Sequence, residues 1–290
     1  MQISSDEFNA YMKPSTAFER NKHMKHLTHA LLSALVISFA PISADAQTGG
    51  DETTVDLGGA VLTRPAYVGS DQYQTNLLPY IGFENLYGFD MRGLAISSDV
   101  IEMGTGKGPG KWSLEAGPRV SFDFGRDSSD SPTLAGLDDI DSSLLLGGFT
   151  RATYGIIGFD LAVGQDVIGG HDGFVADASV GTRYPGQGWF VAPIVTLSWA
   201  NQNFTQDIYG ISQAQTATSA LDQFNTKSGF HQVSATLLGG IDLDEDWSLT
   251  GLISYREALG DYRDSPIIQA EDGTAAGVFA TVGIARRFNF

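Results

Sequence analysis

Hydrophobic and polar positions alternate along most of the chain from about residue 55 onward. In the segment FVADASVGTRY, residues 174–184, one set of alternate positions is mostly apolar, while the other carries Asp177, Ser179 and Arg183. A period of two is that of a β-strand whose two faces meet different environments. Runs of this kind predict twelve strands, at residues 55–63, 75–83, 88–97, 112–125, 143–154, 156–164, 174–184, 189–200, 203–209, 230–242, 247–256 and 276–290.

The length of these runs favours a membrane protein. Most of them have about 9–11 residues or slightly more, and aromatic residues cluster at their ends, as in strands that cross a membrane. The alternative is a soluble β-sandwich, but its polar faces would carry more lysine than this chain has. The pattern therefore predicts an all-β fold, an antiparallel transmembrane β-barrel of about 12 strands. We expect strand 276–290 to close it, with ten or fourteen strands as alternatives.

Residues 24–46 have the pattern of a secretory signal peptide. Lys25 precedes an apolar run at residues 30–40, and Ala44, Asp45 and Ala46 form a small-x-small cleavage site. The alternative is a buried N-terminal helix, since the run is too short to cross a bilayer. We expect a dispensable extension at residues 1–23, a signal peptide at 24–46 and one barrel domain at 47–290. Its expected location is the outer membrane of a Gram-negative cell.

Composition narrows the expected partners. The formal net charge of −17 argues against binding to nucleic acid. The chain has no cysteine, so an exported protein of this sequence cannot rely on disulfides for rigidity. Outer-membrane lipid is the first expected partner. The outer-membrane assembly machinery is the second, because Phe288 and Phe290 look like the aromatic signal that it recognises at the end of a closing strand.

Three segments resemble the MltA-interacting protein (MipA/OmpV) family. Residues 64–86, RPAYVGSDQYQTNLLPYIGFENL, are similar to its P-x-Y-x-G-S segment and the Leu-Pro strand that follows. Residues 207–229 and 259–268 contain YGISQAQ and GDYRDSPI, which resemble its Y-x-G-I-S-x-x-Q-A and G-D-x-x-D-S-P-I motifs. One departure is Tyr262 and Arg263, which stand where small residues are common. The resemblance implies an outer-membrane scaffold that joins a lytic transglycosylase to a murein synthase. Other members of the family are described as porin-like or adhesive proteins, so the resemblance also allows a channel or an adhesin.

Few residues after the signal peptide could act in catalysis or bind a metal. His171 and Asp172 could act as a general base and its orienting carboxylate, but the surrounding glycines favour a solvated turn. His231 opens a strand, and we expect it at the membrane interface. Asp138, Asp139 and Asp141 lack the regular spacing of a calcium loop. We therefore expect no enzyme activity, no cofactor and no metal.

Charged residues on the polar faces of the strands belong in the lumen, because an arginine on the lipid side costs about 2–4 kcal/mol near the midplane. They either pair across a narrow, plugged interior or line a selective pore. Interleaved signs favour pairing. The lumen residues are Asp90, Arg92, Glu115, Arg119, Asp123, Arg151, Asp160, Asp177 and Arg183.

Counting strands back from Phe290, taken as periplasmic, assigns a side to each connection. Residues 98–111, 210–229 and 258–275 are then extracellular, and the turn at 243–246 is periplasmic. The same count puts residues 126–141 in the periplasm, either as a solvated loop or as a docking site for cell-wall enzymes. The candidate partner residues are Asp127, Asp130, Leu134, Leu137, Asp138, Asp139, Ile140 and Asp141.

Overall fold

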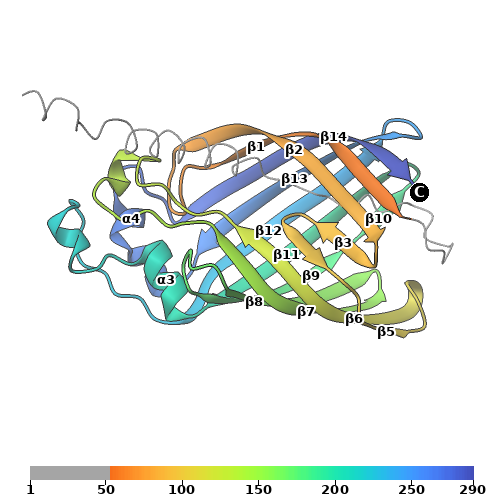
Figure 1. Cartoon of the computed structure of the whole chain (residues 1–290), viewed down its shortest axis with the longest axis horizontal. Helices are drawn as coiled ribbons and strands as arrows, with labels where there is room; N and C mark the ends of the chain where they lie inside the picture. Colours follow the sequence, from red (N-terminus) through yellow and green to blue (C-terminus); the bar gives the residue numbers. More distant parts are fainter. Residues whose placement is uncertain (1–52) are drawn as a thin grey trace, which may run out of the picture. The chain divides into compact units, whose positions relative to one another are not determined.

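The computed structural model describes residues 53–290, and it confirms the all-β barrel. The expected extension and signal peptide lie outside these residues. One antiparallel sheet closes on itself, since β14 pairs with β1 and β11 pairs with β9 (Figure 1). The strands are β1 Thr54–Pro65, β2 Tyr73–Leu86, β3 Phe89–Arg92, β4 Ala95–Ser97, β5 Ile101–Gly104, β6 Gly108–Asp123, β7 Ser143–Gly155, β8 Ile157–Asp166, β9 Phe174–Thr182, β10 Tyr184–Gly186, β11 Trp189–Ala200, β12 Gly229–Asp242, β13 Trp247–Ala258 and β14 Ala276–Asn289.

These segments occupy twelve positions around the barrel. β4 and β5 follow each other along β6, and β9 and β10 follow each other along β11. The predicted number of strands is right only because two errors cancel. One predicted strand is in fact two strands, and another is a helix. Residues 88–97 form the hairpin of β3 and β4, because Gly93 takes a positive φ of 63° and reverses the chain. Residues 203–209 belong to helix α3, Gln202–Tyr209.

Local chemistry explains why α3 is a helix. The Asn201 side chain accepts a hydrogen bond from the Phe204 backbone N–H, which caps the helix N-terminus. Phe204, Thr205 and Tyr209 are its buried residues, a spacing that fits one face of a helix and not alternate positions of a strand. No helix among residues 53–290 is long and apolar enough to cross a membrane.

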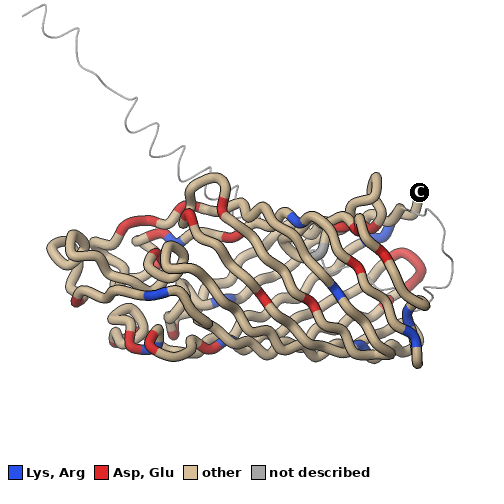
Figure 2. The backbone as a smooth tube through the Cα atoms, turned by 90° about the horizontal axis from the view of Figure 1, so that it is seen from below, with Lys and Arg blue, Asp and Glu red and all other residues tan. Residues whose placement is uncertain are grey.

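Each long strand has an apolar outer face and a mixed inner face. Charged residues lie both along the strands and in the connections at the two ends of the barrel (Figure 2). Exposed aromatic residues border the outer apolar face, with Trp112, Trp189 and Trp247 at one end and Tyr73 and Tyr255 at the other. The outer apolar residues include Leu57, Val61, Leu77, Leu146, Phe159, Leu161, Val163, Val180, Val195, Leu237, Ile253, Val282 and Ile284, all exposed. This is the arrangement of an outer-membrane barrel.

The two ends of the barrel differ. Short turns, such as residues 243–246, lie at the end that carries Phe290, here called the C-terminal end. Long loops lie at the opposite end, with η1 Pro132–Leu134, η2 Gln215–Ala217, η3 Gly260–Asp264 and α4 Pro266–Gln269.

The antiparallel register therefore corrects two of the side assignments. The connection within 98–111 is at the C-terminal end, and 126–141 is at the opposite end. Both assignments were wrong because counting α3 as a strand reversed the direction of every strand between the hairpin and β11.

Candidate functional site

Four loops from different parts of the barrel meet in one structure, which we call the cap: residues 66–72, 124–142, 201–228 and 259–275. Tyr67, Leu134, Ile211 and Ile267 share one hydrophobic cluster, with one residue from each loop. The loop between β6 and β7 starts half a circumference away from the loop between β13 and β14. Because these loops touch, the cap crosses the mouth of the barrel.

Polar contacts hold the cap loops together. Ser131 Oγ donates to Asp272 Oδ2 at 2.6 Å, and Thr133 Oγ1 donates to Asp272 Oδ1. Arg126 is buried, and its Nη1 donates to the backbone oxygen of Ile208 at 3.2 Å. These bonds join the β6–β7 loop to the β13–β14 loop and to α3. The cap is therefore an ordered element with its own core.

The candidate partner loop is part of this cap. Leu134, Leu137 and Ile140 are 0%, 6% and 9% exposed, so the expectation that they anchor a partner is wrong. The aspartates mostly serve the loop itself. Asp127 accepts a hydrogen bond from the Ser129 backbone N–H, and Asp130 accepts one from the Asp127 backbone N–H. Asp139 accepts one from the Ser128 backbone N–H, and Asp138 accepts one from the Gln215 side chain. Asp141 is exposed.

The motifs behind the family resemblance converge in the cap. Tyr67 from the first motif donates to the backbone oxygen of Ile267 in the third, at 3.4 Å. Ser265 from the third donates to the backbone oxygen of Tyr209 in the second, at 2.6 Å. Gly69 has a φ of 104°, and a Cβ there would lie 2.8 Å from Ile268 Cγ1. The sequence pattern did not predict that the three motifs form one site. The available signal was that each motif contains large apolar residues, such as Tyr67, Ile211 and Ile267, of types that are usually buried.

Asp272 should make the cap sensitive to acid. Burial opposes its charged form, but hydrogen bonds from Ser131 and Thr133 outweigh burial and lower the pKa of the carboxyl below its ordinary value. A lowered pKa contributes stability above the unfolded value of about 4, and that stability is lost as the pH falls towards the folded value. We expect smaller amide protection factors in the cap below about pH 4, after correction for the pH dependence of intrinsic exchange. Asp272→Asn should flatten this dependence. An unchanged acid response in that variant would contradict the assignment.

Both histidines among residues 53–290, His171 and His231, have structural surroundings. His171 is 4% exposed, packs edge-on against Phe204, and its Nδ1 accepts a hydrogen bond from the Gly173 N–H. The expectation of a solvated turn is therefore wrong for His171. Its nearest carboxylate is Asp166, at 3.9 Å, and not Asp172. His231 is also buried, with Nδ1 3.2 Å from the Tyr209 hydroxyl. Among residues 53–290, no cluster of three or more ligating side chains could hold a metal.

Three of the predicted lumen charges form a row on neighbouring strands of the barrel wall. Glu115, Arg151 and Asp160 are neighbours on β6, β7 and β8. Arg151 Nη1 lies 3.2 Å from Glu115 Oε2, and its Nη2 lies 3.2 Å from Asp160 Oδ2. Lys107 Nζ is 2.7 Å from Glu115 Oε1. Positive and negative side chains therefore alternate along this wall and form ion pairs.

Other charges interact across the lumen. Arg256 on β13 interacts electrostatically with Asp123 on β6, half a circumference away, and with Asp177 on β9. Its guanidinium lies 3.8 Å from the ring centroid of Phe279. Arg183, between β9 and β10, interacts with Glu84 on the opposite strand β2. These electrostatic interactions link opposite walls of the lumen. The predicted lumen residues did not include Arg256 and Glu84, although alternation places both side chains on the inward face of their strands.

The remaining predicted residues lie apart from these groups. Asp90 Oδ1 accepts a hydrogen bond from the Asn85 N–H in the turn before β3, at 2.8 Å. Arg92 ends β3, and its side chain lies outside what the structure describes. Arg119 pairs in register with Gly147. Phe288 and Phe290 are exposed at the C-terminal end, where Phe290 exchanges backbone hydrogen bonds with Thr53.

Comparisons with known proteins place the chain in a family. An outer membrane channel from Pseudomonas putida F1 is 12% identical, with a TM-score of 0.38 over 84% of this chain and 100% of that one. A Pseudomonas aeruginosa FadL homologue is 10% identical, with a TM-score of 0.31 over 81% and 89%. The MltA-interacting proteins of Escherichia coli K12 and Shigella flexneri are each 30% identical over 161 residues, which is 52% of this chain. The chain spans 59% of the length of these curated relatives. A family model described as MltA-interacting protein MipA matches residues 57–288, so the chain belongs to the MipA family.

Proposed function

We propose that the protein is an outer-membrane barrel that holds periplasmic peptidoglycan-remodelling enzymes, a lytic transglycosylase and a murein synthase, at the membrane. The observation that carries this proposal is the cap, whose loops share one hydrophobic cluster over one mouth of the barrel. The cap crosses one mouth, and Arg256 and Arg183 interact with carboxylates on other walls of the lumen. A barrel obstructed in this way suits a scaffold better than an open porin. The name of the relatives, MltA-interacting protein, supports a murein enzyme as partner.

The partner surface should lie at the C-terminal end. Barrels of the outer membrane keep short turns in the periplasm and long loops outside the cell. By this rule the cap is extracellular, and the turn at residues 243–246 faces the periplasm. This turn presents exposed Asp244, Glu245 and Asp246 beside exposed Leu243. Acidic side chains around an aliphatic residue suit steering and anchoring of an enzyme with a basic surface.

Two measurements test the proposal, one on the purified protein and one on envelope extracts. In planar bilayers we expect no large, steady conductance. In envelope extracts we expect a murein hydrolase and a murein synthase to co-purify with the barrel, and Glu245→Lys to reduce their recovery several-fold by reversing a surface charge. Asp222→Lys in the cap is the matched control and should leave recovery unchanged. A steady open conductance, with no enzyme recovered, would refute the scaffold role.

A further inference from the structure

The barrel wall is short at one place. β3 and β4 have four and three residues, whereas their neighbours β2 and β6 have 14 and 16. In Figure 1 the hairpin of β3 and β4 ends in the middle of the wall, away from α3 and α4. β2 pairs with β3 only at Phe83 and Leu86. The wall between β2 and β6 is therefore incomplete on the side of the cap.

One edge of β2 is left without a strand. Residues 73–79 pair with β1 on one side, from Pro65 to Gly59. Within the described part of the chain, no strand lies on their other side. Strands tilted by about 35–45° are offset from their neighbours by roughly one residue. This offset is too small to explain an unpaired stretch as long as residues 73–79. Pro79 lies in this stretch, and proline is found in sheets at edges, where its missing N–H costs no ladder bond.

This edge lies at membrane depth. Leu77 is 84% exposed and pairs with Val61, which in turn pairs with Val282, so it lies within the outer apolar belt. The aromatic residue Tyr73 lies beyond it towards the cap. Backbone N–H and C=O groups without partners do not face lipid, because each costs several kcal/mol there. Such a backbone is tolerated where it lines water. The gap should therefore be filled with water.

The other rim of the gap leads to a charged interior. Phe122 near the end of β6 donates its N–H to the Leu94 oxygen at the tip of the hairpin. Phe122 and Phe124 pack edge-to-face, with ring centroids 5.2 Å apart. Between them in sequence, Asp123 has the inward phase and interacts with Arg256 across the lumen. Two aromatic rings thus stand beside a polar lumen just beneath the cap.

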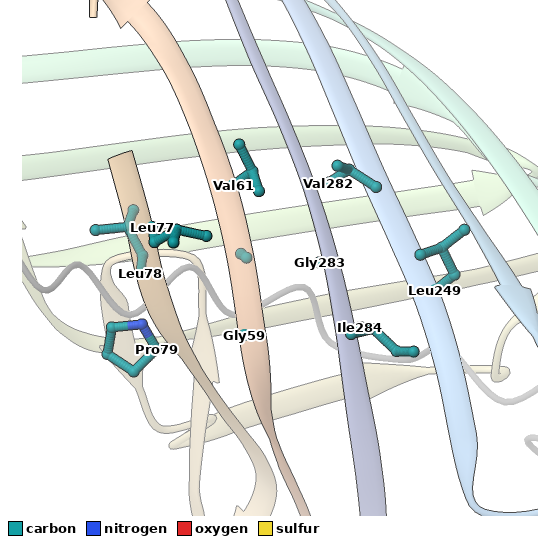
Figure 3. A pocket seen from close by; sticks show the side chains of 10 residues that line it. Gly59, Val61, Leu77, Leu78, Pro79, Leu249, Val282, Gly283 and Ile284 are labelled. Carbon is teal, nitrogen blue, oxygen red and sulfur yellow. The ribbon is translucent and has the colours of Figure 1, made fainter. Parts of the chain in front are cut away.

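The outer face next to this edge is hollowed. A groove of about 620 Å³ lies over β1, β2, β13 and β14, where the outward position Gly59 has no side chain (Figure 3). Val61, Leu77 and Ile284 stand around Gly59 in Figure 3. A Cβ at Gly59 would meet nothing closer than 3.9 Å. The groove shares Leu77 and Pro79 with the free edge, so an apolar surface continues up to the gap.

We propose that the gap above the β3–β4 hairpin is a water-filled lateral portal, through which an amphipathic molecule of the membrane reaches the lumen. Its apolar part would lie along the groove, and its polar part would enter beside Asp123 and Arg256. The cap blocks axial entry at this end, and the side of the barrel supplies the route instead. The hairpin length sets the height of the portal.

Because the chain has no cysteine, single cysteines can test the portal in lipid vesicles. Leu77→Cys lies on the free edge. Val282→Cys is its matched control, because it occupies the same register row on β14, which has partners on both sides. A charged, membrane-impermeant maleimide reacts with the thiolate, which forms in water and is suppressed in lipid. We expect Leu77→Cys to react at least about tenfold faster than Val282→Cys.

A second variant separates the portal from local looseness. Adding alternating Val and Thr residues on both sides of Gly93 and Leu94 would extend the hairpin along β2. In this background the reaction of Leu77→Cys should slow to the rate of Val282→Cys. Equal, slow reaction of both cysteines in the original barrel would overturn the portal, since lipid or a bound strand would then cover the edge. Fast reaction that persists after the hairpin is lengthened would overturn it as well.

Discussion

Replacing Arg256 with leucine should destabilise the barrel by less than the roughly 3–5 kcal/mol of a fully buried ion pair, because a partly buried charge network loses its cation. Arg256 interacts electrostatically with Asp123 and Asp177, which lie on two other parts of the wall. Without Arg256, Asp177 keeps a hydrogen bond from Ser198 Oγ at 2.6 Å, but the two carboxylates repel each other. Urea unfolding of the protein in lipid vesicles measures the loss.

Arg286→Leu is the matched control. Its ion pair with Asp246 has a distance of 2.8 Å, but the two side chains are 48% and 53% exposed. An exposed pair contributes at most about 1 kcal/mol, so this variant should unfold almost as the parent does. Adding Asp123→Asn to Arg256→Leu should recover part of the loss. An Arg256→Leu barrel of unchanged stability, with a shifted reversal potential in bilayers, would instead indicate a wide hydrated pore.

Leu134→Ala should loosen the cap by about 2–5 kcal/mol while leaving the strands paired. Leu134 is fully buried in the cluster that joins the four cap loops, so its removal leaves a cavity where those loops meet. The strands depend on their own ladder and should stay closed. We therefore expect faster proteolysis within residues 124–142 and 201–228, and brief conducting events in bilayers that the parent does not show.

Two variants control this result. Leu243→Ala removes a leucine that is 52% exposed at the C-terminal end, and it should change neither proteolysis nor conductance. Leu134→Met nearly conserves the volume and should cost less than about 1.5 kcal/mol. If Leu134→Ala opened the whole barrel, with loss of the strands, the cap would be inseparable from the wall. That outcome would contradict a cap with its own core.

Much of the fold could be predicted from residue order. Alternation of apolar and polar residues reports burial on one face of a strand, and this is a local property that needs no knowledge of neighbouring strands. It located most of the long strands, such as β6, β7 and β12, within a few residues. It also placed Glu115, Arg151 and Asp160 on inward faces. The three motif segments identified the family, which the match over residues 57–288 confirms.

Short segments were ambiguous from the sequence, because few positions carry their period. Residues 203–209 alternate well enough to look like a strand, and only the Asn201 cap and the contacts of Phe204 and Tyr209 make them a helix. A single wrong element reverses the direction of all strands that follow until a second error restores it. The side assignments of 98–111 and 126–141 failed for this reason.

The tertiary structure alone decided the cap and the pairing of the lumen charges. Alternation shows that Asp123 and Arg256 point inwards, but residues 133 positions apart interact electrostatically only because closure of the barrel brings β6 opposite β13. Leu134, Leu137 and Ile140 look like exposed anchors among aspartates until loops from other strands cover them. Local patterns record which side of the wall a residue faces. Its partner across the lumen or the mouth depends on strand order and register, which are long-range properties of the closed sheet.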